Sequence, residues 1–319
     1  MKRSKVWAFL TVLVGMAILA APVFADSLTI NFDSYALGTI NGQDGWSSLG
    51  SAGSGCAVYD HAVVANTYGY TSFGTKSLRM SNAVTSGCFG DQTFSKSLAN
   101  EAGETTATNN GLSGGVRQPH FEAQWDFAST VPTAEQPGLS VVASPDRGDG
   151  SRMSWVQMQD TPGGLQVNFF DVQGTTNPAN FVGPTVVAAG LDRTIPHTIK
   201  ISVDFFDGPS NDVVKVYVDG ALRLTGTTWE NYYRYDAEAQ PEGGPRTVDS
   251  ILFRTGNAPA PATAGNGFLI DNLTLTSGPI LVGPPTNKDQ CKTGGWKTFN
   301  TPRTFNNQGD CIQYVNTGK

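Results

Sequence analysis

The chain has 319 residues, of which 21 are lysine or arginine and 27 are aspartate or glutamate, so its formal net charge is −6. This acidic balance argues against nucleic acids and anionic membrane surfaces as partners, because both require basic patches. It is compatible with neutral glycans, cations or other proteins.

The first segment has the pattern of a secretory leader. Three basic residues precede an uncharged apolar run from Val6 to Ala20, and Val23 and Ala25 suit signal-peptidase cleavage before Asp26. We therefore expect residues 1–25 to be a signal peptide and the mature protein to be secreted or held in the cell envelope. A retained anchor is the alternative, although the run is shorter than the roughly 20 residues of a membrane span. No later segment approaches that apolar length, so we expect no span after cleavage.

Cleavage would make the mature protein more acidic. The leader contains three lysines and arginines and no acidic residue, so 18 basic residues (21 minus 3) would face 27 acidic ones, a net charge of −9.

Strand patterns follow in chain order, separated by turn signals. We expect strands at Ser27–Phe32, Ser77–Met80, Phe121–Phe127, Leu139–Ala143, Arg152–Asp160 and Leu165–Asp171. Turns are expected at Ser144-Pro145-Asp146 and Pro162-Gly163-Gly164, because proline and glycine interrupt regular structure.

The stretch from Pro196 to Thr276 carries the clearest pattern. His197–Asp207 alternates apolar and polar residues with the period of a half-buried strand. Val213–Val218 ends at Asp219-Gly220, a dipeptide that suits a type I′ turn because both residues take positive φ, and Ala221–Thr227 returns as the partner strand. Val248–Arg254 and Gly267–Thr276 complete the set, and almost no residue pattern here is typical of a helix.

This many strands with short turns cannot bury one face of a single flat sheet. We therefore predict an all-β, two-sheet antiparallel jelly-roll sandwich over residues 26–277 with very little helix. Residues 278–286 contain three prolines and two glycines, which indicates a linker. Residues 287–319 form a short tail bounded by two cysteines.

Four cysteines follow the leader, and an even count in an exported chain indicates disulfides. The sequence alone allows three connectivities. We expect the local pairs Cys56–Cys88 and Cys291–Cys311, because each pair lies within its own segment. A metal site is disfavoured, because the cysteines show no CxxC spacing and the three histidines no paired-ligand spacing with them.

Several segments resemble the concanavalin A-like lectin/glucanase superfamily in its bacterial laminin-G-like form. They are Asn31-Phe32-Asp33-Ser34-Tyr35 with Ile40–Trp46, the hairpin from Lys215 to Gly220, and Gly267-Phe268-Leu269-Ile270-Asp271-Asn272. The resemblance implies the jelly-roll fold but no particular activity, since the superfamily includes lectins, hydrolases, lyases and adhesive modules. The glucanase signature of two glutamates flanking an aspartate on one strand is absent as such. The tail, Cys291–Trp296 with Phe305–Cys311, looks similar to cysteine-bounded tails of other exported bacterial proteins.

The main catalytic candidates lie on the Phe121–Phe127 strand. Alternation places Glu122, Gln124 and Asp126 on one face, and a carboxylate pair is what glycoside cleavage needs. The Cα atoms of Glu122 and Asp126 would lie about 13 Å apart at ~3.3 Å per residue, so both side chains would have to lean inward. The alternative is a solvated polar face.

Trp155, Gln157 and Gln159 share one face of their strand. Should that face be shared with Glu122 and Gln124, the tryptophan would stack on a pyranose ring and the amides would bind hydroxyls. In the alternative, Trp155 belongs to the core.

Two further segments have candidate binding residues. Trp229, Tyr232 and Tyr233 belong to an aromatic loop that we expect either to form a glycan-contacting rim or to pack over an open end of the sandwich. Asp207, Asn211 and Asp212 offer oxygen atoms to a calcium ion, the one possible cofactor, without the spacing of an EF-hand. An ordinary Asx turn is the alternative.

These observations favour an exported, non-catalytic protein that binds carbohydrate or another cell-envelope component. The first alternative is a glycoside hydrolase or polysaccharide lyase, with Glu122 and Asp126 as the acid/base and nucleophile of the hydrolase. The second is a purely structural envelope protein.

Overall fold

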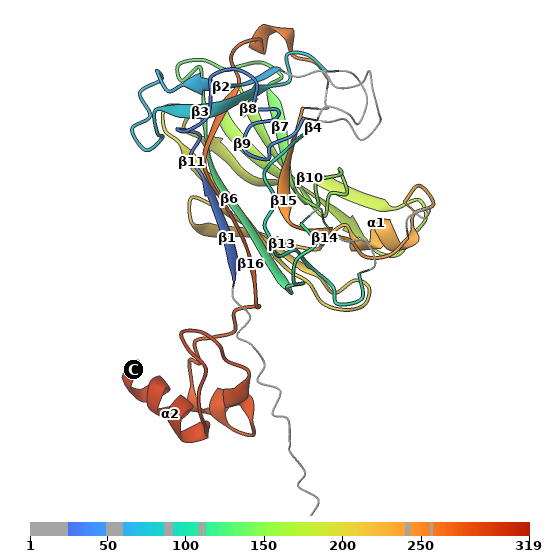
Figure 1. The fold of residues 1–319 in the computed structure, drawn as a ribbon, viewed down its shortest axis with the longest axis vertical. Helices are drawn as coiled ribbons and strands as arrows, with labels where there is room; N and C mark the ends of the chain where they lie inside the picture. Colours follow the sequence, from blue (N-terminus) through green and yellow to red (C-terminus); the bar gives the residue numbers. More distant parts are fainter. Residues whose placement is uncertain are drawn as a thin grey trace, which may run out of the picture.

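The structure is a computed structural model, and it describes residues 25–48, 60–85, 92–107, 111, 113–239, 243–255 and 258–319. Two antiparallel sheets stack as a jelly-roll sandwich, and a small C-terminal tail lies beyond one end of it (Figure 1). The predicted fold class is therefore confirmed. Residues 1–24 of the predicted leader, Cys56 and Cys88 lie outside the described residues.

Sheet A has eight strands. Their order is β13 (Ala221–Gly226), β12 (Val213–Val218), β11 (His197–Asp204), β6 (His120–Ser129), β16 (Phe268–Gly278), β3 (Lys76–Ser81) and β2 (Asp60–Ala65), with β1 (Asp26–Ile30) also paired to β16.

Sheet B has six strands. Their order is β10 (Asn180–Leu191), β9 (Gly164–Gln173), β8 (Trp155–Thr161), β7 (Ser140–Asp146), β15 (Ser250–Arg254) and β4 (Gln92–Phe94). A two-stranded sheet pairs β14 (Thr247–Val248) with β5 (Ala102–Gly103).

Helical segments are few and short. Beside the sandwich are α1 (Glu230–Tyr235) and the 3-10 turn η1 (Pro261–Thr263), and in the tail are η2 (Lys288–Cys291), η3 (Gly295–Lys297) and α2 (Gln308–Thr317). Among the described residues, no helix is both long and apolar enough to span a membrane.

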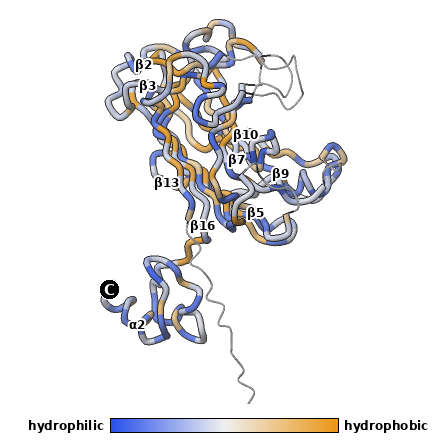
Figure 2. The backbone as a smooth tube through the Cα atoms, in the orientation of Figure 1, coloured by the Kyte–Doolittle hydropathy of each residue, from blue (hydrophilic) through white to orange (hydrophobic). Residues whose placement is uncertain are grey.

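The core lies between the two sheets and follows from strand alternation. Phe121, Ala123, Trp125 and Phe127 of β6 point inward and are fully buried. The Trp125 ring meets Phe253 of sheet B edge to face, with centroids 5.9 Å apart. Hydrophobic residues accordingly concentrate along the strands of the sandwich, β16 among them (Figure 2).

The turn predicted at Ser144-Pro145-Asp146 is wrong, because these residues continue β7. Pro145 lies opposite Ile251, whose backbone N–H and C=O both bond to Ser95 on the other side of β15. Pro145 also lies beyond Ala143, the last β7 residue paired with β8. The missing N–H of the proline therefore leaves no sheet hydrogen bond unmade.

The loop expected around Trp229 is also wrong in part, because Glu230–Tyr235 forms α1. An ion pair joins Glu230 in its first turn to Arg234 in its last, with the arginine Nε 3.2 Å from the carboxylate. A pair at this spacing supports a helical turn and is oriented favourably with the helix dipole.

The tail has its own small apolar cluster. Cys291 and Cys311 are joined by a disulfide, as predicted, and both pack with Phe299 and Phe305. Between β16 and η2, residues 279–287 contain no helix or strand. The Asn300 side chain binds this connection through the Ile280 carbonyl and the Val282 N–H.

Substitution of Gly220 tests the hairpin turn. Asp219 and Gly220 have φ values of 51° and 75°, as a type I′ turn requires, and a Cβ on Gly220 would meet no atom within 4 Å. Gly220→Ala should therefore lower the free energy of unfolding by about 1–2 kcal/mol through backbone strain alone, measured by urea titration. Gly163→Ala is the control, since that turn glycine has equal space and no positive φ. Equal losses for both variants would refute the assignment.

Removal of the disulfide tests how the tail is held. A bridge that closes a loop of about 20 residues contributes roughly 3 kcal/mol, and the tail cluster is too small to replace it. Paired Cys291→Ser and Cys311→Ser substitutions should make the tail protease-sensitive and leave the melting temperature of the sandwich unchanged. A tail that resists proteolysis, or a destabilised sandwich, would contradict this account.

Candidate functional site

A pocket lined by aromatic side chains opens where the end of sheet B meets α1. Its volume is about 190 Å³, and we call it the aromatic pocket. It is lined by Arg152, Trp155, Phe181, Trp229, Tyr232 and Glu238. These residues come from the start of β8, from β10, and from α1 with its flanks, so the fold assembles the pocket from three separate segments.

Trp229 anchors the rings of the pocket. It is buried, and its indole Nε1 donates a 3.0 Å hydrogen bond to the Phe170 carbonyl of β9. The Trp155 and Phe181 rings contact it edge to face, with centroids 5.4 and 5.0 Å away. Phe181 is 49% exposed, so it presents apolar surface to solvent from a fixed base.

Polar groups accompany these rings. The Tyr232 hydroxyl is hydrogen bonded to Glu238, and burial together with this carboxylate raises the pKa of Tyr232 to about 12. The Arg152 guanidinium carbon lies 5.9 Å from the centre of the Trp155 ring, within cation–π range. A hollow that combines aromatic rings with a few hydrogen-bonding groups suits a ligand with apolar faces and polar edges.

Of the residues predicted to contact a ligand, the pocket gathers Trp155, Trp229 and Tyr232. Tyr233 instead points inward and is buried, and its hydroxyl donates a 2.9 Å hydrogen bond to the Arg152 carbonyl. Arg152, Phe181 and Glu238 were not predicted. Phe181 lies on β10, a strand whose glycines and proline hide the alternation that would have revealed it.

Gln157 and Gln159 lie in an amide network on the outer face of sheet B. Asn168 donates to the side-chain carbonyls of both, at 3.1 and 2.8 Å, and Gln157 donates to Ser140 at 2.9 Å. Gln157 is buried, whereas Gln159 is partly exposed.

The shared face proposed for Trp155 and Glu122 does not exist. Glu122, Gln124 and Asp126 lie on the outer face of sheet A, because the alternate residues of β6 fill the core. Trp155, Gln157 and Gln159 alternate with the core residues Val156 and Met158 of sheet B. The two sets therefore lie on opposite sides of the sandwich. Gln124 lines a separate hollow of about 340 Å³ with Thr198, Lys200, Tyr217 and Gly220.

The carboxylates of Glu122 and Asp126 are each engaged by neighbouring strands. Glu122 lies 3.7 Å from His120 Nε2 and 3.1 Å from Lys200 Nζ, and these contacts lower its pKa despite partial burial. Asp126 accepts hydrogen bonds from Thr198 Oγ1 at 2.5 Å and Asn272 Nδ2 at 2.8 Å. A carboxylate with a lowered pKa is ionised at neutral pH and is a poor general acid.

His120 is held as a cation in the same network. Burial would lower its pKa, but hydrogen bonds to Asp204 and Glu122 outweigh burial and raise the pKa to about 9. Its Nδ1 lies 2.6 Å from an Asp204 oxygen. The outer face of sheet A thus balances its own charges.

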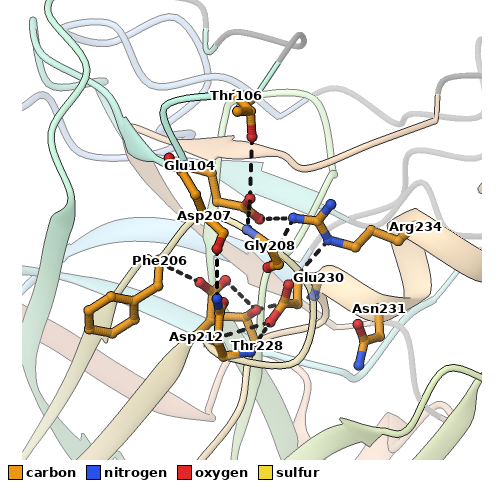
Figure 3. A network of polar contacts seen from close by, with 12 residues as sticks. Glu104, Thr106, Phe206, Asp207, Gly208, Asp212, Thr228, Glu230, Asn231 and Arg234 are labelled. Atoms are coloured by element: carbon orange, nitrogen blue, oxygen red, sulfur yellow. Dashed lines mark hydrogen bonds and ion pairs between the residues drawn. The ribbon is translucent and has the colours of Figure 1, made fainter.

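Three buried carboxylates, which we call the carboxylate cluster, meet beside α1 (Figure 3). They are Glu104, Asp212 and Glu230, and each offers an oxygen within 4.8 Å of the others. Arg234 reaches into the cluster and pairs with both glutamates. Asp212 accepts hydrogen bonds from the Phe206 N–H at 2.9 Å and from Thr228 Oγ1 at 2.7 Å.

Only one of the three predicted calcium ligands, Asp212, belongs to this cluster. The Asp207 carboxylate accepts from the Thr105 N–H at 2.8 Å, and the Asn211 amide donates to the Asp207 carbonyl at 2.8 Å. Carboxylate oxygens are what calcium prefers, but here Arg234 already supplies a positive charge. Burial and the charge of Glu230 raise the pKa of Asp212 to about 8. Asp212 is then largely protonated at neutral pH, which further reduces the negative charge of the carboxylate cluster.

Asp212 should make stability depend on pH. Because its pKa is higher in the folded than in the unfolded protein, its contribution is greatest below about pH 4 and is lost as the pH rises to about 8. Asp212→Asn removes this titration. The difference in melting temperature, variant minus wild type, should therefore be more positive at pH 8.5 than at pH 5. We expect about 2–4 °C for each kcal/mol of stability that the titration of Asp212 contributes.

Asp207→Asn is the control for this measurement, because the pKa of Asp207 is lowered by its hydrogen bonds to Thr105. A difference between Asp212→Asn and wild type that is the same at both pH values would show that Asp212 is ionised in the folded protein.

Comparisons with known proteins leave the family of this chain unassigned. No family model and no curated protein matches it. Solved structures similar to it include a sialidase (13% identity, TM-score 0.38, 83% of this chain and 19% of the sialidase). Others are an alginate lyase from Pseudomonas aeruginosa (10%, 0.34, covering 63% and 82%) and the carbohydrate-binding module CBM66 from Bacillus subtilis (12%, 0.32, covering 73% and 96%). The chain thus spans about a fifth of the sialidase, and likenesses this weak carry no argument about function.

Proposed function

We propose that this protein is an exported, non-catalytic carbohydrate-binding jelly-roll protein whose ligand site is the aromatic pocket. The observation that carries the proposal is the meeting of Trp155, Phe181 and Tyr232 around one hollow with a guanidinium and a carboxylate at its wall. Aromatic rings pack against the apolar faces of a sugar ring, and charged side chains bind its hydroxyl groups.

The arrangement of the pocket supports binding without large rearrangement. Trp229 is fixed by its hydrogen bond to β9, and the exposed Phe181 ring packs against it. Preorganised rings cost little conformational entropy when a ligand arrives. In this proposal the sandwich, residues 26–277, is the binding unit, and the linker and tail are separate from it.

The contacts of Glu122 and Asp126 favour binding over hydrolysis. An acid/base and nucleophile pair needs carboxyl groups about 5–9 Å apart around a groove. These two are four residues apart on one strand and are each bonded to neighbouring side chains. Export is supported by the Cys291–Cys311 disulfide, since such bonds persist in oxidising compartments.

Phe181→Ala tests the pocket. We expect the full chain to bind at least one polysaccharide in a panel of xylan, β-glucan, galactan and polygalacturonate, measured by affinity electrophoresis. Phe181→Ala should weaken that binding about tenfold, because a lost ring contact costs about 1–1.5 kcal/mol.

The matched control is Val186→Ala, which shortens an exposed apolar side chain of the same strand outside the pocket. Equal effects of the two substitutions would exclude the pocket as the binding site. The appearance of new reducing ends or unsaturated uronates during incubation would instead support the enzymatic alternative.

A further inference from the structure

We propose that the aromatic pocket holds one uncharged sugar residue at a time, rather than a stretch of glycan chain or an acidic sugar. This inference rests on the proposed function and adds to it the size and the charge of the unit that is recognised.

The volume of the pocket limits how much of a glycan can enter it. At about 190 Å³ the pocket is smaller than the roughly 300–1,000 Å³ of pockets that enclose drug-sized ligands. An apolar cavity of about 150 Å³ in another protein holds a single benzene ring. The aromatic pocket therefore has room for one six-membered ring with its substituents and not for two linked sugars. Neighbouring residues of a longer chain would lie outside it.

The arrangement of the rings leads to the same limit. Trp229 is only 3% exposed, and the centroids of the other three rings lie 5.4, 5.0 and 6.4 Å from it, for Trp155, Phe181 and Tyr232 respectively. Phe181 and Tyr232 also contact each other, with centroids 5.5 Å apart. Rings that contact successive residues of a chain have to be spaced along its path, whereas these converge on one tryptophan. They offer apolar contact to a single sugar ring.

The charges in the lining balance. Arg152 supplies one positive charge and Glu238 one negative charge, and Glu238 accepts the hydrogen bond of the Tyr232 hydroxyl. A charged sugar in so small a hollow would meet one like charge beside one opposite charge. Sugar hydroxyls gain from both side chains, because they donate to a carboxylate and accept from a guanidinium. A residue with hydroxyl groups and no charge of its own therefore suits the lining best.

The net charge of the chain adds to this preference. It is −6 for the full sequence. A protein with negative net charge repels polyanions unless a local excess of positive charge attracts them. Among the described residues that line the pocket, one arginine is matched by one glutamate, so the lining supplies no such excess.

The first measurement tests the size of the recognised unit. The full chain is titrated calorimetrically with oligosaccharides of two to six residues, prepared from a polysaccharide that it binds. We expect the affinity per oligosaccharide to rise by no more than about threefold, the ratio of the residue counts, because one residue is held at a time. A rise of about tenfold or more would show several residues bound together and overturn the inference. If that binding still depended on Phe181, the proposed function would stand.

The second measurement tests the charge. Methyl glycosides of glucose, galactose and mannose are compared with those of the matching uronates, in which a carboxylate replaces the hydroxymethyl group. We expect at least one neutral glycoside to displace the polysaccharide and to bind more tightly than its uronate. Glu238→Gln should raise the affinity for the uronate relative to the neutral sugar about fivefold, the effect of one like charge about 4 Å away in water.

Glu135→Gln is the matched control. It removes the same charge beside Gln136, whose N–H bonds to Asp160 at the opposite end of β8 from Trp155. Equal effects of the two substitutions, or tighter binding of the uronate by the wild-type protein, would overturn the inference. Thermal melts of each variant establish that the fold is retained. Failure to bind any sugar or polysaccharide would overturn the proposed function itself.

Discussion

The contact between the inward row of β6 and sheet B is the constraint on which the rest of the structure depends. Trp125 meets the Phe253 ring at 5.9 Å, and its indole N–H lies 3.5 Å from the Met158 sulfur, so one side chain joins both sheets. Because side chains alternate along a strand, burying Trp125 forces Glu122, Gln124 and Asp126 outward. The same rule applied to β8 points Met158 into the core between the sheets and puts Trp155 on the other face of sheet B, where it is partly buried. One packing contact thus assigns two candidate sites to opposite faces.

The two faces then differ in chemistry. On sheet A, neighbouring strands place opposite charges beside one another, and Glu122, Lys200, His120 and Asp204 form a network that satisfies itself. In this network the lowered pKa of Glu122 keeps its carboxylate ionised. On sheet B, the end near α1 instead places the exposed Phe181 ring and the partly exposed Trp155 and Tyr232 rings around one hollow. The difference explains why we assign ligand binding to the aromatic pocket.

Buried acids around α1 illustrate how the fold tolerates carboxylates that no catalytic role requires. Arg234 pairs with both Glu104 and Glu230, and the raised pKa of Asp212 favours its neutral form. The remaining oxygens accept hydrogen bonds from backbone and threonine groups, so the desolvation cost is offset locally. This cluster fixes α1 to the loops at the end of the sandwich. Since α1 presents Tyr232 and follows Trp229, the cluster also positions two walls of the pocket.

The sequence by itself determined the period-two strands and the Asp219-Gly220 turn and favoured the Cys291–Cys311 bridge, because each depends on residues close together in the chain. It also identified Trp155, Trp229 and Tyr232 as aromatic candidates for ligand contact. It missed β10, where Gly183, Pro184 and shifts in register disrupt alternation, and α1, where a buried ion pair stabilises six residues. Only the tertiary structure decided that Phe181 and Arg152 share a pocket with those aromatics and that Glu122 does not. Sheet packing and strand order decide which outward-facing residues come together in the folded protein. Both depend on contacts between distant segments that no local pattern encodes.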